Sequence, residues 1–134
     1  MLLDRKTVVL ENLDTMKRSY VKLTLLKERE REAQEGDDYE FLYELSENER
    51  VLIEGINDCL KCIVPDLLAL REDETIRTLL AEIDELHGIV ISESIRIRRD
   101  LRRSMVETEE KLRSLRVFPG SSHTPPPHIL NIRA

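Results

Sequence analysis

Apolar residues recur every three or four positions over most of the chain, and this spacing predicts helices rather than strands. In the first segment the repeat consists of Val9, Leu13, Met16, Tyr20, Leu23 and Leu26. It predicts a helix over residues 4–35. After Leu26 the chain is charged on every side, so no buried face is expected there. Gly36 is expected to close the helix, because glycine readily adopts the left-handed conformation found at helix ends.

A second apolar repeat predicts a helix over residues 38–64, with Asp37 and Glu40 as a capping pair at its start. The repeat consists of Phe41, Leu42, Leu45, Leu52, Ile56, Cys59, Leu60 and Ile63. Glu49 falls inside it, where a polar side chain can fix the register of packed helices at a cost in stability. Pro65 is expected to break or sharply kink this helix, because proline cannot donate a backbone hydrogen bond.

The longest repeat predicts a third helix over residues 74–117. It consists of Leu79, Ile83, Leu86, Val90, Ile97, Leu101, Met105, Thr108, Leu112 and Leu115. From residue 118 the chain holds four of its five prolines, which predicts a flexible tail over residues 118–134. We therefore expect one helical domain, residues 1–117, and a tail. The expected fold is all-α: an elongated antiparallel helical hairpin or three-helix coiled-coil-like bundle.

The composition agrees with helices that pack along narrow apolar stripes, since 36% of the residues are charged and only 4% are aromatic. The net charge of −6 disfavours general binding to nucleic acid, which depends on a positive surface. The charge is uneven, however. Residues 28–54 contain eleven acids and three bases, whereas residues 96–116 contain eight bases and four acids.

Five arginines lie within eight positions of the third predicted helix. They are Arg96, Arg98, Arg99, Arg102 and Arg103. The favoured interpretation is an outer face that pairs with acids of the first or second helix, and the alternative is a patch for an acidic protein or nucleic acid. No aromatic residue is interleaved among these arginines, which disfavours single-stranded nucleic acid.

Few side chains are suited to catalysis or metal binding. Cys59 and Cys62 form a C-x-x-C pair, but the pair ends a helical run and does not lie where a strand meets a helix, as a redox site requires. A zinc site would need two further ligands, and His123 and His128 are about 60 residues away. We expect two small buried or half-buried thiols and a partly buried, hydrogen-bonded His87. No enzyme activity, metal or cofactor is expected.

The sequence also suggests a compartment. No run approaches the roughly 18 apolar residues that a membrane span requires, and residues 1–13 lack the continuous apolar core of a secretory signal peptide. Two cysteines in an otherwise unbridged chain fit a reducing environment. The expected location is the cytoplasm.

The run GDDYEFLYELSENERVLIEGI, residues 36–56, resembles the second helix of the FlgN-type flagellar export chaperones. It has their acidic turn, L-x-x-L stripe, charged patch and L-I-x-x-I. The order of a long first helix, a hairpin and a long third helix with a loose tail is also similar. The resemblance implies a cytoplasmic chaperone that holds the amphipathic terminal segments of hook-associated proteins before type III export and contacts the export apparatus.

The resemblance also implies that the long third helix binds the substrate. The residues it suggests are Ile91, Ile95, Ile97, Leu101, Met105, Leu112, Leu115 and Phe118. Family members use a late aromatic residue to dock on the export gate, and Phe118 is the only late aromatic in this chain.

The residues themselves leave alternatives open. The third predicted helix carries more isoleucines than one stripe needs, so a second apolar face can accept an amphipathic helix. The same isoleucines can instead close a homodimer or the hairpin's own core, and the chain can be a structural coiled-coil adaptor that forms a permanent oligomer. The apolar residues of the tail, Ile129, Leu130 and Ile132, are expected to dock in a groove of a partner or of a copy.

Overall fold

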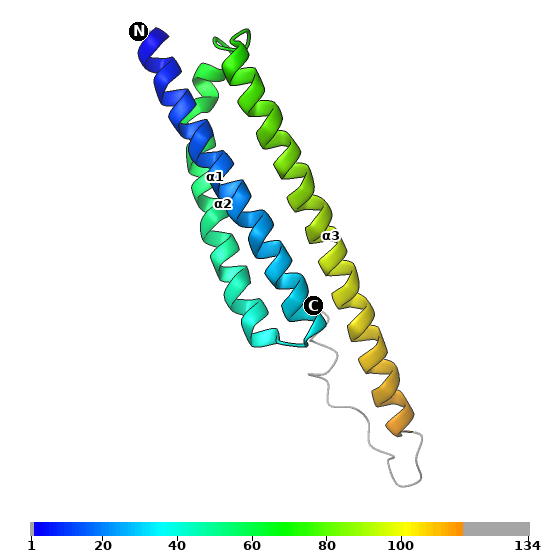
Figure 1. Cartoon of the computed structure of the whole chain (residues 1–134). Helices are drawn as coiled ribbons and strands as arrows, with labels where there is room; N and C mark the ends of the chain where they lie inside the picture. Colours follow the sequence, from blue (N-terminus) through cyan, green and yellow to red (C-terminus); the bar gives the residue numbers. More distant parts are fainter. Residues whose placement is uncertain (1, 117–134) are drawn as a thin grey trace. The chain divides into compact units, whose positions relative to one another are not determined.

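A computed structural model of the chain describes residues 2–116, with the side chains of residues 4–115. This part of the chain forms three helices and no strand: α1 (Leu2–Glu35), α2 (Tyr39–Leu67) and α3 (Glu74–Arg116) (Figure 1). The predicted all-α helical bundle is confirmed. The predicted tail, with Phe118 at its start, lies outside the described residues. The described chain divides inside α3 into two compact units, of which unit 1 ends at Arg98 and unit 2 begins at Arg99.

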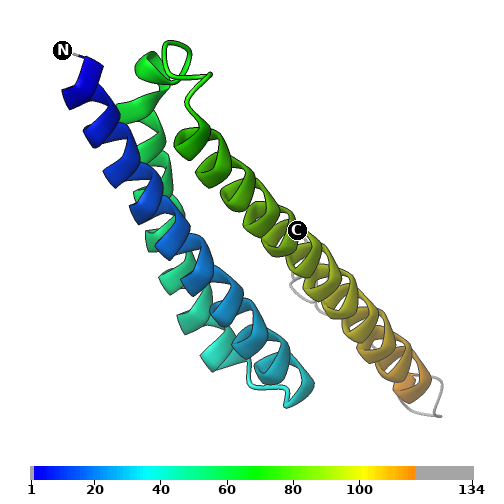
Figure 2. The same ribbon diagram turned by 45° about the horizontal axis from the view of Figure 1, so that its top comes forward.

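Helices α1 and α2 lie side by side and run in opposite directions (Figures 1 and 2). Two ion pairs show the antiparallel direction of the two helices. Arg5, near the start of α1, pairs with Asp66 at the end of α2, whereas Lys27, late in α1, pairs with Glu49 in the first half of α2. The two helices therefore form the predicted antiparallel hairpin.

The part of α3 that belongs to unit 1, up to Arg98, runs parallel to α1. Lys17 pairs with Glu82 at 2.6 Å, and Arg31 pairs with Glu93 at 3.0 Å, so residue numbers increase together along the two helices. Because such partly exposed pairs stabilise a protein little, the packing of side chains must hold α3 in place.

The interior of unit 1 contains residues of all three helices and of the connection after α2. The buried apolar cluster consists of Val9, Leu13, Met16, Leu23, Ile56, Ile63, Leu70, Ile76, Ile83 and Val90. Within α3 its members are seven residues apart, the period of a helix that packs along one stripe. Burying each Leu, Ile or Val side chain contributes about 1.5–3 kcal/mol, so this cluster is the main source of stability.

The turn between α1 and α2 differs by one residue from the prediction. Asp37, and not Gly36, has the positive φ, at 55°. The N–H groups of Asp37 and Asp38 donate to carbonyl oxygens of the last turn of α1, at 3.1 and 2.8 Å, which is a Schellman motif. Asp38, and not Asp37, then caps α2 by accepting a hydrogen bond from the N–H of Phe41 at 3.1 Å.

Helix α2 continues through Pro65 and ends at Leu67, whereas the sequence predicted an end at residue 64. Pro65 lies in the last turn, where the chain leaves the helix two residues later. Proline has no N–H, so one backbone hydrogen bond of α2 is lost at this point. The loss is small in effect, because the last carbonyl groups of a helix have no partner within the helix in any case.

Asp73 caps α3 by accepting a hydrogen bond from the N–H of Ile76 at 3.1 Å. Its other carboxylate oxygen lies 2.6 Å from Nζ of Lys6. The hydrogen bond from Lys6, followed by that from Ile76, lowers the pKa of Asp73 from its usual value. This residue thus connects the start of α3 to the first turns of α1.

Candidate functional site

The predicted partner-binding residues of unit 1 divide into exposed and buried ones. Ile91 and Ile95 lie one turn apart on α3 and expose 45% and 50% of their surface. Ile97 exposes only 6% and continues the seven-residue spacing of the buried positions 76, 83 and 90. It is a core residue, and that spacing in the sequence could have shown it. Only the first two are available to a partner.

In unit 2, the described part of α3 presents further apolar side chains. Met105 and Leu115 are exposed, and Leu101 and Leu112 are half-buried. Val106 is also exposed, although the sequence analysis did not select it. This segment can therefore offer apolar surface, while Phe118 lies outside the described residues.

A layer of charged residues is buried inside unit 1, and only Glu49 among them was predicted to lie in an apolar stripe. Lys27 and Glu30 of α1 and Glu49 of α2 expose 6%, 5% and 8% of their surface. Nζ of Lys27 pairs with a carboxylate oxygen of Glu49 and lies 3.4 Å from Oε2 of Glu30. The other oxygen of Glu30, Oε1, has no hydrogen-bond partner among the described residues. We call these three residues the charged layer.

The charged layer corrects the expectation that no face is buried after Leu26. Lys27 and Glu30 continue the spacing of Leu13, Met16, Tyr20 and Leu23 along α1, so they point inward although they are charged. Glu49 occupies its predicted position in the stripe of α2 and is buried there. The only sequence signal was the unbroken three- and four-residue spacing, because hydropathy does not mark charged core positions.

The arginine cluster does not make the expected contacts in unit 1. Arg96 and Arg98 are exposed, and neither forms an ion pair with another described residue of that unit. The expectation that they pair with acids of the first two helices is therefore wrong. Arg99, Arg102 and Arg103 are exposed in unit 2.

The two cysteines are free, with Cys59 half-buried and Cys62 exposed. Burial, followed by the charges of Cys62 and Asp58, raises the pKa of the Cys59 thiol. A raised thiol pKa means less of the reactive thiolate, which disfavours a redox role. Cys62 is more exposed than expected.

His87 is hydrogen-bonded as expected, but it is exposed rather than partly buried. Its Nδ1 lies 3.0 Å from Oη of Tyr20, and the two rings meet edge to face with centroids 5.7 Å apart. Burial raises the pKa of the Tyr20 hydroxyl. The pair joins α1 to α3.

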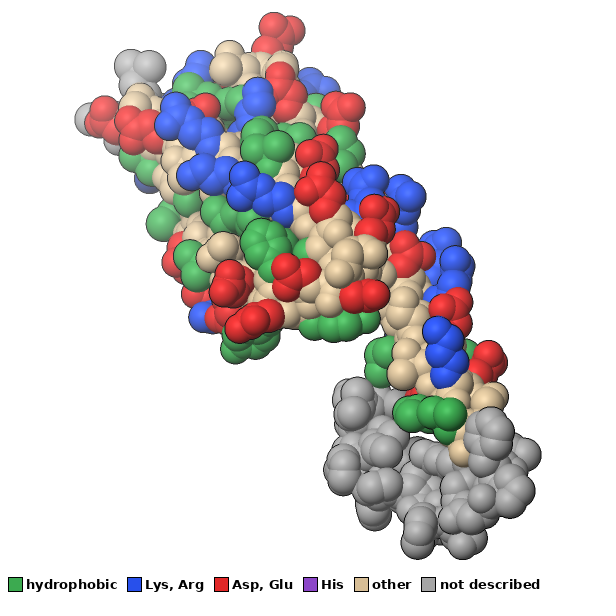
Figure 3. All heavy atoms as spheres, turned by 60° about the horizontal axis from the view of Figure 1, so that its bottom comes forward, with side chains coloured by type: hydrophobic (Ala, Val, Ile, Leu, Met, Phe, Trp, Pro, Cys, Tyr) green, Lys and Arg blue, Asp and Glu red, His purple; other side chains and the backbone are tan. Residues whose placement is uncertain are grey.

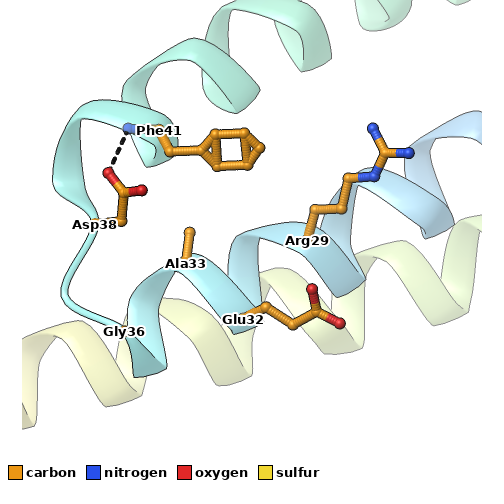
Figure 4. A pocket seen from close by; sticks show the side chains of 6 residues that line it. All are labelled: Arg29, Glu32, Ala33, Gly36, Asp38 and Phe41. Atoms are coloured by element: carbon orange, nitrogen blue, oxygen red, sulfur yellow. Dashed lines mark hydrogen bonds between the residues drawn. The ribbon is translucent and has the colours of Figure 1, made fainter.

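Two hollows lie between α1 and α2, and the sequence analysis predicted neither. The first, about 420 Å³, is lined by Lys22, Leu25, Leu26, Arg29, Asn48, Val51 and Leu52. The second, about 480 Å³, is lined by Arg29, Glu32, Ala33, Gly36, Asp38 and Phe41. In the second, Ala33 points toward the ring of Phe41, and Arg29 lies on the far side of that ring (Figure 4). Arg29 lines both hollows, and we call them together the α1–α2 groove.

Comparison of the chain with models of protein families, with curated proteins and with solved structures finds no match. Among the described residues, no helix is long and apolar enough to cross a membrane. The same part of the chain contains no group of three or more His, Cys, Asp or Glu side chains placed to hold a metal ion. Figure 3 shows hydrophobic and basic side chains next to each other on one face of unit 1.

Proposed function

We propose that this chain is a binding protein without catalytic activity, an export chaperone of the FlgN type that acts in the cytoplasm. It holds the amphipathic terminal segment of a hook-associated protein and presents it to the export apparatus. The resemblance of residues 36–56 to that family supports this proposal, as does the order of three long helices.

The observation that carries the proposal is the exposure of Ile91 and Ile95 on α3. They are four residues apart, so their side chains lie on the same side of the helix. A folded protein gains nothing by leaving two isoleucines in water, whereas burying each against a partner contributes about 1.5–3 kcal/mol. Amphipathic helices are recognised through contacts at this spacing.

The test is the double substitution Ile91→Asp with Ile95→Asp. Both positions are exposed, so the variant is expected to keep its helix content by circular dichroism. Binding of a fluorescently labelled terminal segment of a hook-associated protein, followed by anisotropy, should weaken by about 100-fold or more. Ile97→Asp is unsuitable, because a charge at this buried position would unfold the bundle.

Val8→Asp is the matched control, since Val8 is 46% exposed on α1. It should leave binding of the segment unchanged. Wild-type affinity in the Ile91→Asp, Ile95→Asp variant would overturn the proposal. Equal loss in the Val8 variant would show that the effect is not specific to α3.

A second candidate function is a structural coiled-coil adaptor that forms a permanent oligomer. The observation that favours it is a row of exposed apolar residues on α2, Ile53, Leu60 and Val64, at helical spacing. A homodimer that buries this row would persist on dilution, because permanent interfaces are large and apolar. Sedimentation equilibrium over a wide concentration range distinguishes the two, since the chaperone is expected to be monomeric or weakly dimeric when free.

A further inference from the structure

The α1–α2 groove combines exposed apolar side chains with basic ones. Leu25 and Val51 expose 53% and 60% of their surface, and Phe41, at the other end of the groove, exposes 37%. Leu26 and Leu52 are half-buried beneath them. The first hollow is therefore largely apolar apart from Lys22, Arg29 and Asn48, whereas Glu32 and Asp38 add two acids to the second.

The basic residues at the groove differ from the other basic residues of α1. Helix α1 contains eight basic residues, and six of them form ion pairs. The two that form no ion pair with any residue of the described chain are Lys22 and Arg29, and both line the groove. In a chain with a net charge of −6, acids are plentiful, so two unpaired cations at one groove indicate a surface suited to an acidic ligand.

The spacing of these residues specifies the ligand further. Lys22, Leu25, Leu26 and Arg29 follow one another on one side of α1, with apolar residues between two cations seven positions apart. Seven residues of helix span about 10 Å. A second helix that lies along the groove can match this pattern with leucine-type side chains at its centre and carboxylates seven positions apart.

We propose that the α1–α2 groove is a second binding site, separate from Ile91 and Ile95 of α3, and that it takes a partner helix with acidic residues flanking an apolar centre. The apolar side chains of that helix cover Leu25 and Val51, and its carboxylates pair with Lys22 and Arg29. Burial of apolar area supplies the affinity, and the two charge pairs fix the position of the helix along the groove.

A second copy of the same chain is the alternative occupant of this groove. Symmetric dimers bring the same patch of each subunit together about a twofold axis. About an axis near Leu25, Arg29 of one copy would lie beside Lys22 of the other. Glu28 and Glu32 of α1 lie close to these cations along the helix, so the oligomeric state of the free protein has to be measured together with peptide binding.

The experiment measures binding of the full-length protein to a synthetic peptide of about 20 residues, long enough to form helix in water. The peptide carries glutamates at positions i and i+7 and leucines at i+3 and i+4. A control peptide has lysines in place of the glutamates. Both carry a fluorescent label, and binding is followed by anisotropy.

Lys22→Glu with Arg29→Glu should weaken binding of the glutamate peptide about tenfold and make the lysine peptide the better ligand. Leu25→Asp with Val51→Asp should abolish binding of the glutamate peptide and of the lysine peptide. Lys61→Glu, which reverses an exposed charge nine residues beyond Leu52 on α2, should change neither. All these positions are exposed, and circular dichroism checks that each variant is folded.

The proposal is overturned if the glutamate peptide does not bind, or if charge reversal at the groove does not exchange the preference between the peptides. It is also overturned if the free protein is a dimer that Leu25→Asp with Val51→Asp dissociates, because a second copy would then occupy the groove. The Ile91→Asp, Ile95→Asp variant should bind the glutamate peptide normally, so failure of this site and failure of the α3 site are distinguishable.

Discussion

The interior of unit 1 is built in two different ways. Around Leu13, Ile63 and Ile76 the three helices meet through apolar side chains that are almost fully buried. Nearer the turn between α1 and α2, equivalent inward positions hold Lys27 and Glu49 together with Glu30. The first region gains free energy from burial. In the second, the attraction between charges roughly offsets the cost of removing them from water, so its contribution lies in fixing which residues of α1 and α2 face each other.

The surfaces proposed to bind partners lie beside the charged layer or beside the Arg31–Glu93 ion pair that follows it along α1. Leu25 lies two residues before Lys27, and Val51 lies two residues after Glu49. Ile91 and Ile95 lie on either side of Glu93, which pairs with Arg31 of α1. Binding surfaces generally belong to the less stable parts of a protein. We infer that the apolar region acts as the scaffold and the charged region as the part that adapts to a partner.

Removing Lys27 should have the largest effect on stability. Lys27→Met leaves the carboxylates of Glu30 and Glu49 buried without their cation, and we expect the free energy of unfolding to fall by about 3–5 kcal/mol. Urea denaturation followed by circular dichroism measures the change. Lys22→Met is the matched control, because Lys22 is exposed and unpaired on the same helix, and it should change stability by less than about 0.5 kcal/mol. A small loss of unfolding free energy in Lys27→Met would mean that the buried carboxylates of Glu30 and Glu49 do not need the charge of Lys27, and would contradict this view of the layer.

Replacing the whole charged layer by leucine should have a smaller effect of the opposite sign. Lys27→Leu, Glu30→Leu and Glu49→Leu together remove three buried charges and extend the apolar region. Stability should stay unchanged or rise by about 1–4 kcal/mol. Without the layer, α1 and α2 should pack against each other in more than one way, and this should broaden the side-chain signals in NMR spectra. A strongly destabilised triple variant would contradict the view that the layer contributes specificity rather than stability.

A smaller effect, on pH dependence, is expected at the apolar end, where Asp73 pairs with Lys6 and caps α3. Because folding lowers the pKa of Asp73, its contribution to stability is complete above the unfolded value of about 3.9. That contribution is lost as the pH falls through the folded pKa. Asp73→Asn should therefore be less stable than wild type in urea at pH 7, and the difference should shrink toward pH 3. Asp84→Asn, which removes an exposed carboxylate of α3, is the control for a change in net charge alone, and an equal deficit at both pH values for Asp73→Asn would refute the linkage.

The sequence predicted the helices well, because Val9, Leu13, Met16 and Leu23 mark one side of α1 at clear helical spacing. It predicted the charged layer poorly. Buried Lys27 looks like any surface lysine until a partner such as Glu49 is placed opposite it, and this pairing depends on how α1 and α2 meet.

Of the candidate sites, too, the sequence could predict one and not the other. Ile91 and Ile95 could be selected as surplus apolar residues, whereas Ile97 belongs to the core by its seven-residue spacing. The α1–α2 groove could not be selected, because Leu25 and Val51 are far apart in the sequence. Only the packing of the hairpin brings them to one surface and shows that Lys22 and Arg29 form no ion pair within the described chain.

The most direct test of the division between scaffold and adaptable region is native-state hydrogen exchange of the free protein, resolved by residue along α1. We predict that amides of residues 26–33 exchange by local opening, at least about tenfold faster than those of residues 9–23 after correction for intrinsic rates. The reason is that the charged layer holds its end of the hairpin with less net free energy than the apolar cluster provides. Equal protection along the whole of this stretch would show that unit 1 opens only as a whole, and would contradict the account.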